Sequence, residues 1–107
     1  MDNTTSTLQD LYNRTPRRHN DENIKEINNI VTEYEDILMS IEAINGYYEK
    51  QLPAFFDVVE EVKLTIKKSN DKKISKKSKD EYFDIAACTL KDSIEELISL
   101  YGDGKKV

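Results

Sequence analysis

A long apolar repeat constrains the fold of this chain more than any other feature. In alternating steps of three and four residues, twelve of its thirteen positions are apolar or aromatic, and only Asn45 is polar. This spacing is typical of amphipathic helices whose apolar faces pack against other helices. The repeat consists of Ile24, Ile27, Val31, Tyr34, Leu38, Ile41, Asn45, Tyr48, Leu52, Phe55, Val59, Val62 and Ile66.

The composition agrees with an all-α domain. Only 3 Gly and 2 Pro among 107 residues leave few sites for tight turns, and this length suits one domain with a narrow core. The single cysteine, Cys88, permits no intramolecular disulfide. The first twenty residues contain no apolar run, and no stretch is long enough to cross a membrane. We therefore expect a cytoplasmic or otherwise intracellular protein.

Capping signals delimit the expected helices. Asn20 or Asp21 can cap the start of the first helix. Gly46 suits its end, because glycine tolerates the left-handed conformation that terminates many helices. After a polar connector, Ser78 and Glu81 form the S-x-x-E pattern of a capping box and open the last helix. Gly102 marks the end of this helix.

These boundaries divide the chain into three parts. We expect residues 1–19 to form a flexible N-terminal arm, residues 20–101 a helical bundle domain, and residues 102–107 a frayed C-terminal tail. Leu8, Leu11 and Tyr12 give the arm one apolar turn. Isolated helices shorter than roughly 12 residues are marginal in water, so this turn needs a docking surface to persist.

Two architectures agree with the pattern. If the chain turns between Gly46 and Pro53, the helices form a three-helix antiparallel bundle. If it does not turn, one long kinked helix spans residues 21–68 and the last helix returns along it, as in a coiled coil. Either way, the apolar face is longer and wider than a 107-residue monomer needs, which favours a binding partner.

Five aromatic residues are the candidate partner-binding site. Tyrosine is amphipathic and enriched at protein interfaces, and aromatics lie on more than one face of the second helix. A bundle buries only one stripe of each helix, so part of this set is expected at the surface. The set consists of Tyr34, Tyr47, Tyr48, Phe55 and Phe56.

A lysine-rich connector is the candidate anion-binding site. Residues 67–79 carry seven Lys against one Asp, whereas residues 20–66 carry eleven Asp or Glu against three Lys. This segment could contact nucleic acid, anionic lipid or an acidic protein. The candidate residues are Arg17 and Arg18 of the arm and Lys72, Lys73, Lys76 and Lys77 of the connector.

No pattern indicates an enzyme. The only histidine, His19, lies in the arm, which leaves no histidine pair for acid–base catalysis or metal binding. Cys88 has small and apolar neighbours, as structural thiols do. The chain lacks a glycine-rich phosphate loop and calcium-binding spacing. We therefore expect no cofactor and no bound metal.

The sequence thus predicts a small, non-enzymatic helical protein that acts by protein–protein binding. It could serve as an inhibitor, chaperone, adaptor or scaffold-type subunit, and its partner could be another protein or a second copy of itself. The alternative is a nucleic-acid accessory protein that uses the lysines of the connector and Arg17 and Arg18. The net charge of −5 makes this alternative weaker, because an acidic protein is repelled by phosphates.

Overall fold

The computed structural model describes residues 4–16, 20–44 and 46–104, with side chains described up to Tyr101 in the last helix. Within this part of the chain the fold is all-α, as predicted, and it has four helices rather than three. The helices are α1 (Thr4–Arg14), α2 (Asp21–Glu42), α3 (Gly46–Ser69) and α4 (Lys76–Gly104).

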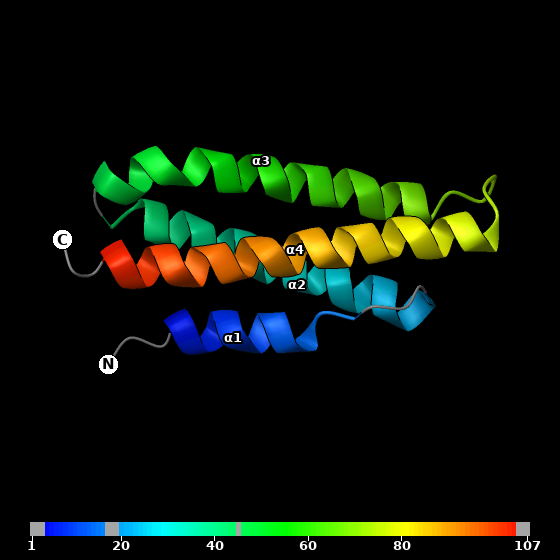
Figure 1. Cartoon of the computed structure of the whole chain (residues 1–107), viewed down its shortest axis with the longest axis horizontal. Coiled ribbons are helices and arrows are strands. Elements are labelled where there is room, and N and C mark those ends of the chain that lie inside the picture. Colours follow the sequence, from blue (N-terminus) through cyan, green and yellow to red (C-terminus); the bar gives the residue numbers. More distant parts are fainter. Residues whose placement is uncertain (1–3, 17–19, 45, 105–107) are drawn as a thin grey trace.

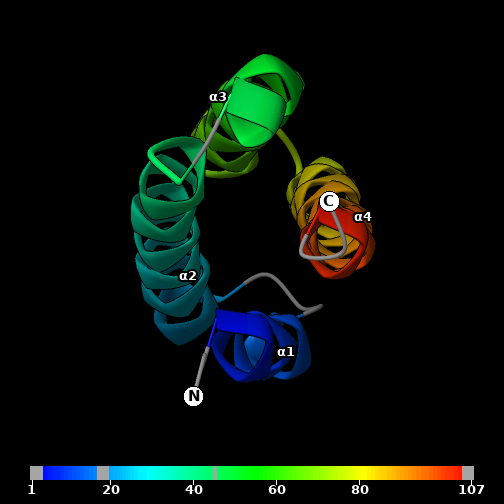
Figure 2. The same ribbon diagram turned by 90° about the vertical axis from the view of Figure 1, so that its left-hand side faces the viewer.

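The four helices lie side by side along one axis and alternate in direction (Figure 1). Viewed along this axis, they follow one another around a ring in chain order, so that α1 and α4 also become neighbours (Figure 2). The short α1 covers only part of the length of the bundle (Figure 1). None of the described helices is long and apolar enough to span a membrane.

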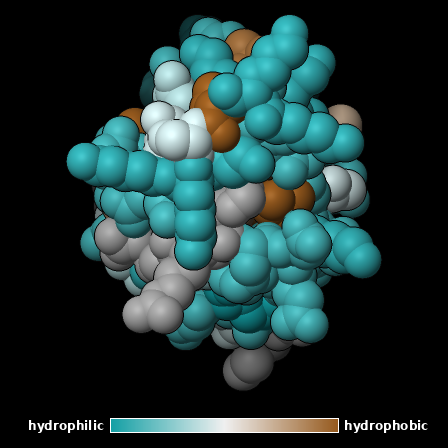
Figure 3. All heavy atoms as spheres, turned by 90° about the vertical axis from the view of Figure 1, so that its right-hand side faces the viewer, coloured by the Kyte–Doolittle hydropathy of each residue, from teal (hydrophilic) through white to brown (hydrophobic). Residues whose placement is uncertain are grey.

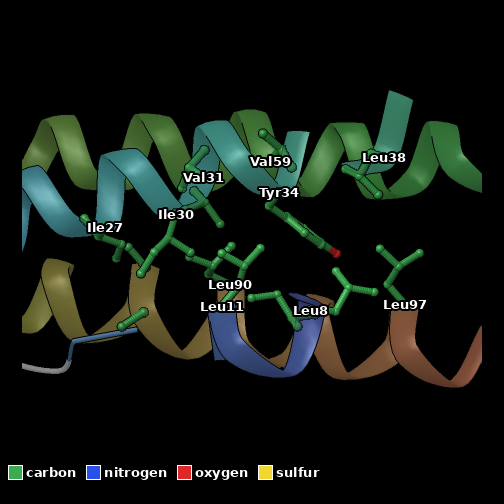
Figure 4. Packing of buried hydrophobic residues seen from close by; sticks show 14 of the residues in the cluster. Leu8, Leu11, Ile27, Ile30, Val31, Tyr34, Leu38, Val59, Leu90 and Leu97 are labelled. Carbon is green, nitrogen blue, oxygen red and sulfur yellow. The ribbon is translucent and has the colours of Figure 1, made fainter. Parts of the chain in front are cut away.

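A single apolar core fills the centre of the ring, and every helix contributes to it (Figure 4). Most of the predicted repeat is buried there, and the last helix presents a matching face with heptad-like spacing. The buried apolar residues are Leu8, Leu11, Ile27, Ile30, Val31, Tyr34, Leu38, Ile41, Tyr48, Leu52, Val59, Val62, Ile66, Phe83, Ala86, Ala87, Leu90, Ile94, Leu97 and Tyr101.

The predicted N-terminal arm contains the fourth helix. Leu8 and Leu11 of α1 are fully buried between α2 and α4, and this tertiary burial stabilises a helix too short to persist alone. The Thr15 hydroxyl donates to the Leu11 carbonyl at 2.8 Å, and Pro16 follows directly. Proline is common just beyond a helix end because it cannot continue the helix.

The chain does turn, but earlier than expected. α2 ends at Glu42 and α3 begins at Gly46, so Gly46 starts a helix instead of ending one. Asn45 lies outside the described residues. Pro53, predicted as a break, is exposed within α3. Buried Leu52 before it and Val59 after it lie on one core face, and their burial outweighs the local cost of proline.

Helix capping agrees with the prediction at one helix and differs at another. The Asn20 side chain accepts a hydrogen bond from the Asn23 amide at 2.7 Å, so Asn20, and not Asp21, is the cap of α2. For α4 the predicted cap is wrong by one turn, because the Ser75 hydroxyl accepts from the Ser78 amide at 3.2 Å. The same helix passes through Gly102 to Gly104, anchored by buried Tyr101.

Candidate functional site

Two of the predicted partner-binding residues lie in the core. Tyr34 is fully buried, and its hydroxyl is 2.7 Å from the Ser93 hydroxyl across the α2–α4 interface. Burial raises the pKa of Tyr34, because the phenolate would lose its hydration. Tyr48 is buried too and donates to the Tyr101 carbonyl at 3.0 Å. A partner could reach either ring only if the helices separated.

The other three aromatics are half-buried and pack against the core from α3. The Tyr47 ring meets Tyr48 edge-on, with centroids 5.4 Å apart, and Tyr48 stacks on Tyr101 at 5.8 Å. This cluster joins the start of α3 to the end of α4. Phe55 and Phe56 leave only part of their rings accessible. The aromatic set therefore does not form one exposed patch.

The predicted anion-binding lysines lie at the opposite end of the bundle. Lys72, Lys73, Lys76 and Lys77 are exposed, whereas Arg17 and Arg18 lie outside the described residues. The one opposing carboxylate, Asp71, accepts a hydrogen bond from the Lys73 amide at 2.9 Å. Viewed end-on, this face is mainly hydrophilic, with small hydrophobic areas among the polar atoms (Figure 3).

A surface groove opens next to these lysines, between the start of α2 and the end of α3. We call it the lysine-rimmed groove; its volume is about 630 Å³. Half-buried Ile24 and buried Ile66 line it, and Leu64 stands 59% exposed. The full lining is Ile24, Asn28, Lys63, Leu64, Ile66, Lys67, Lys68, Asn70 and Asp71.

The lysines of this groove differ in their electrostatic surroundings. Lys63 reaches across to α2, with its Nζ 3.0 and 3.2 Å from the two Glu35 carboxylate oxygens, and it lies 3.6 Å from Glu60. The hydrogen bond that Lys63 donates to the Glu35 carboxylate raises the pKa of Lys63. Lys67 and Lys68 are exposed and form no ion pair with any described residue. Both lie in the last turn of α3, where their positive charges stabilise the negative end of the helix dipole. Their ammonium groups can also bind an anionic group of a ligand.

Sequence reasoning missed the apolar part of this groove. Leu64 lies outside the apolar repeat, between the buried positions Val62 and Ile66. An aliphatic residue on the outer face of the expected helix, Leu64, was therefore the only sign in the sequence of this apolar surface. Its neighbour Ile24 belongs to the repeat and lies on another helix, so only the fold brings the two together in one groove.

The described residues contain no cluster of three or more His, Cys, Asp or Glu that could hold a metal ion. Neither a family model, nor a curated protein sequence, nor a solved structure matches this chain.

Proposed function

We propose that this protein acts by binding another protein, and that the lysine-rimmed groove receives an acidic amphipathic helix of the partner. The observation that carries the proposal is the exposed Leu64 side chain beside Lys67 and Lys68. Lys67 and Lys68 have no ion partner among the described residues, and they line the same groove as this leucine. The groove therefore offers a ligand both apolar contact and positive charge. Inhibition, chaperoning or scaffolding would follow from what the partner does.

The shape of the groove supports a helical ligand. It lies between two antiparallel helices, where a third helix can pack its side chains into the space between them. Its volume of about 630 Å³ admits a few apolar side chains, which would contact Leu64 and Ile24. Glutamates flanking those side chains would meet Lys67 and Lys68, and such complementary charges give specificity and speed association.

Nucleic acid is the second candidate, because the connector carries the densest positive charge in the sequence. The apolar lining of the groove supports a protein ligand over a phosphate backbone, which has no apolar group to contact Leu64. A salt titration separates the two, since binding through several phosphates weakens steeply as salt rises. A short DNA duplex is a suitable probe.

The test uses a fluorescently labelled peptide helix with leucines at every third or fourth position and glutamates beside them. Anisotropy should show saturable binding to the full chain. Leu64→Asp should weaken binding about tenfold or more, since burying a leucine contributes about 1.5–3 kcal/mol. Charge reversal at Lys67 and Lys68 should weaken it as well.

The matched control is Ile85→Asp on α4, because Ile85 is 53% exposed and does not line the groove. This variant should bind the peptide as the wild type does. Both positions are surface sites, so circular dichroism should show unchanged helicity. If Ile85→Asp weakens binding as much as Leu64→Asp, the peptide is not held in the groove and the proposal is wrong.

A further inference from the structure

The short helix α1 occupies the space between α2 and α4 (Figure 2). These two longer helices make few direct contacts with each other. Helix α3 joins them on the far side of the ring, so α2, α3 and α4 form three sides of a groove that α1 fills. The molecule therefore already contains a helix seated in a helix-binding groove.

Two leucines provide the apolar part of this seat. Leu8 and Leu11 point inward, toward Tyr34 of α2 and toward Leu90 and Leu97 of α4 (Figure 4). Both leucines are fully buried. With their spacing of three residues they lie on one face of α1, as the anchors of helix-in-groove complexes do.

A salt-sensitive cluster provides the polar part. The Arg14 guanidinium lies 2.9 Å from Glu26 and 3.1 Å from Glu33 of α2, and 3.2 Å from Asp10. These hydrogen bonds raise the pKa of Arg14, which therefore stays charged. The Arg14 side chain is 36% exposed, so salt and water weaken these pairs. On α4, the Lys91 Nζ lies 4.5 Å from the centre of the Tyr12 ring.

Helix α1 is the element that we expect to detach most readily. With 11 residues it is below the length at which an isolated helix is stable, and only two of its side chains are fully buried. Elements with few buried contacts open at lower free energy than the rest of a fold. Opening would expose the faces of α2 and α4 that now surround Leu8 and Leu11.

We propose that the seat of α1 is a second protein-binding site, at which a basic amphipathic helix of a partner displaces α1. The helix already seated there defines the ligand: two leucines three residues apart, and an arginine or lysine three residues later. The leucines would fill the positions of Leu8 and Leu11, and the basic group would meet Glu26 and Glu33. This site is independent of the lysine-rimmed groove and selects the opposite charge.

The experiment uses the full chain and a labelled peptide copy of residues 1–16. Anisotropy should show weak, saturable binding to the wild type. Arg14→Ala in the protein removes the ion pairs that hold its own α1, whereas the peptide keeps its arginine. The α1 of this variant competes less well for the groove, so the variant should bind the peptide about 2–5-fold more tightly. A peptide with Leu8→Asp and Leu11→Asp should not bind to either protein.

The matched control holds α1 in place. Thr7 and Ser40 line the same small surface depression, so cysteines at both positions can be joined by a short bismaleimide, with Cys88→Ser in all proteins. The linked protein should not bind the peptide. Equal binding by the linked protein, or no binding by Arg14→Ala, would overturn the proposal.

Light scattering on the Arg14→Ala protein tests a competing occupant. A mass that stays monomeric across concentrations supports a partner helix. A dimer that forms as concentration rises would show that α1 exchanges between two copies of this chain, and it would overturn the proposed partner.

Discussion

Removing the Tyr34 hydroxyl tests whether this residue acts in the core rather than at an interface. In the structure, this hydroxyl meets Ser93 at 2.7 Å in a fully buried position. Tyr34→Phe keeps the ring and removes one buried hydrogen bond, which should cost about 1 kcal/mol of the free energy of unfolding. The Ser93 hydroxyl can then donate to a backbone carbonyl of its own helix. We therefore expect the loss of stability not to exceed this value.

The opposite substitution should cost more. Ser93→Ala leaves the Tyr34 hydroxyl buried without this partner, and an unsatisfied buried hydroxyl costs about 1–3 kcal/mol. Since the two groups contact each other directly, the double variant should show a coupling energy of about 1 kcal/mol. Urea unfolding followed by far-UV circular dichroism gives all three values.

The pH dependence provides a second readout of the same group. Burial raises the pKa of Tyr34 above its ordinary value of about 10, so the unfolded chain releases this proton first as pH rises. Its stabilising contribution is complete below about pH 10 and falls by about 1.4 kcal/mol per pH unit above that value. By about pH 11 the stability deficit of Tyr34→Phe relative to the wild type should have disappeared.

Two results would refute this reasoning. A coupling energy near zero would mean that the Tyr34–Ser93 hydrogen bond does not contribute to folding. A deficit that stays constant as pH rises would mean that the Tyr34 hydroxyl reaches solvent. In the second case, Tyr34 would be accessible to a partner, as the sequence predicts.

Three further substitutions test the fold around the two proposed sites. Leu8→Ala should destabilise the protein by about 2–5 kcal/mol in urea unfolding, because Leu8 is fully buried; a loss below about 0.5 kcal/mol, as at surface positions, would mean that α1 is not docked. Arg14→Ala should cost less than about 1 kcal/mol, and the loss should shrink in salt. Pro53→Ala should raise the melting temperature, since an exposed alanine in α3 restores a helical amide that proline lacks; a lower value would contradict this.

The apolar repeat predicted most of the core because burial and period are directly linked. Ile27, Val31 and Leu38 lie inside, as their spacing requires. The repeat could not predict what the tyrosine hydroxyls would meet. The partner of Tyr34 lies 59 residues away, and that of Tyr48 lies 53 residues away, so only the fold shows that both are satisfied internally.

The helical N-terminal segment could be predicted only in part. Its apolar turn at Leu8 and Leu11 was visible, but its stability comes from contacts with α2 and α4 and not from local propensity. The sequence also predicted a helix break at Pro53 and a helix start at Ser78, and both predictions were wrong for a similar reason. Packing of the long helices decided where α3 continued, and Ser75 supplied an equally suitable cap one turn earlier.

The fourth helix changes where a partner can bind. The repeat is longer than a three-helix monomer needs, and that excess first indicated a binding surface; α1 accounts for part of it by closing the ring. The two proposed sites therefore combine parts of the repeat, such as Ile24, with Leu64 outside it, or use the seat that α1 occupies. The two sites have opposite charges at their edges, lysines at one and Glu26 and Glu33 at the other. The uneven charge of the sequence thus agrees with the two binding sites proposed above, which would take ligands of opposite charge.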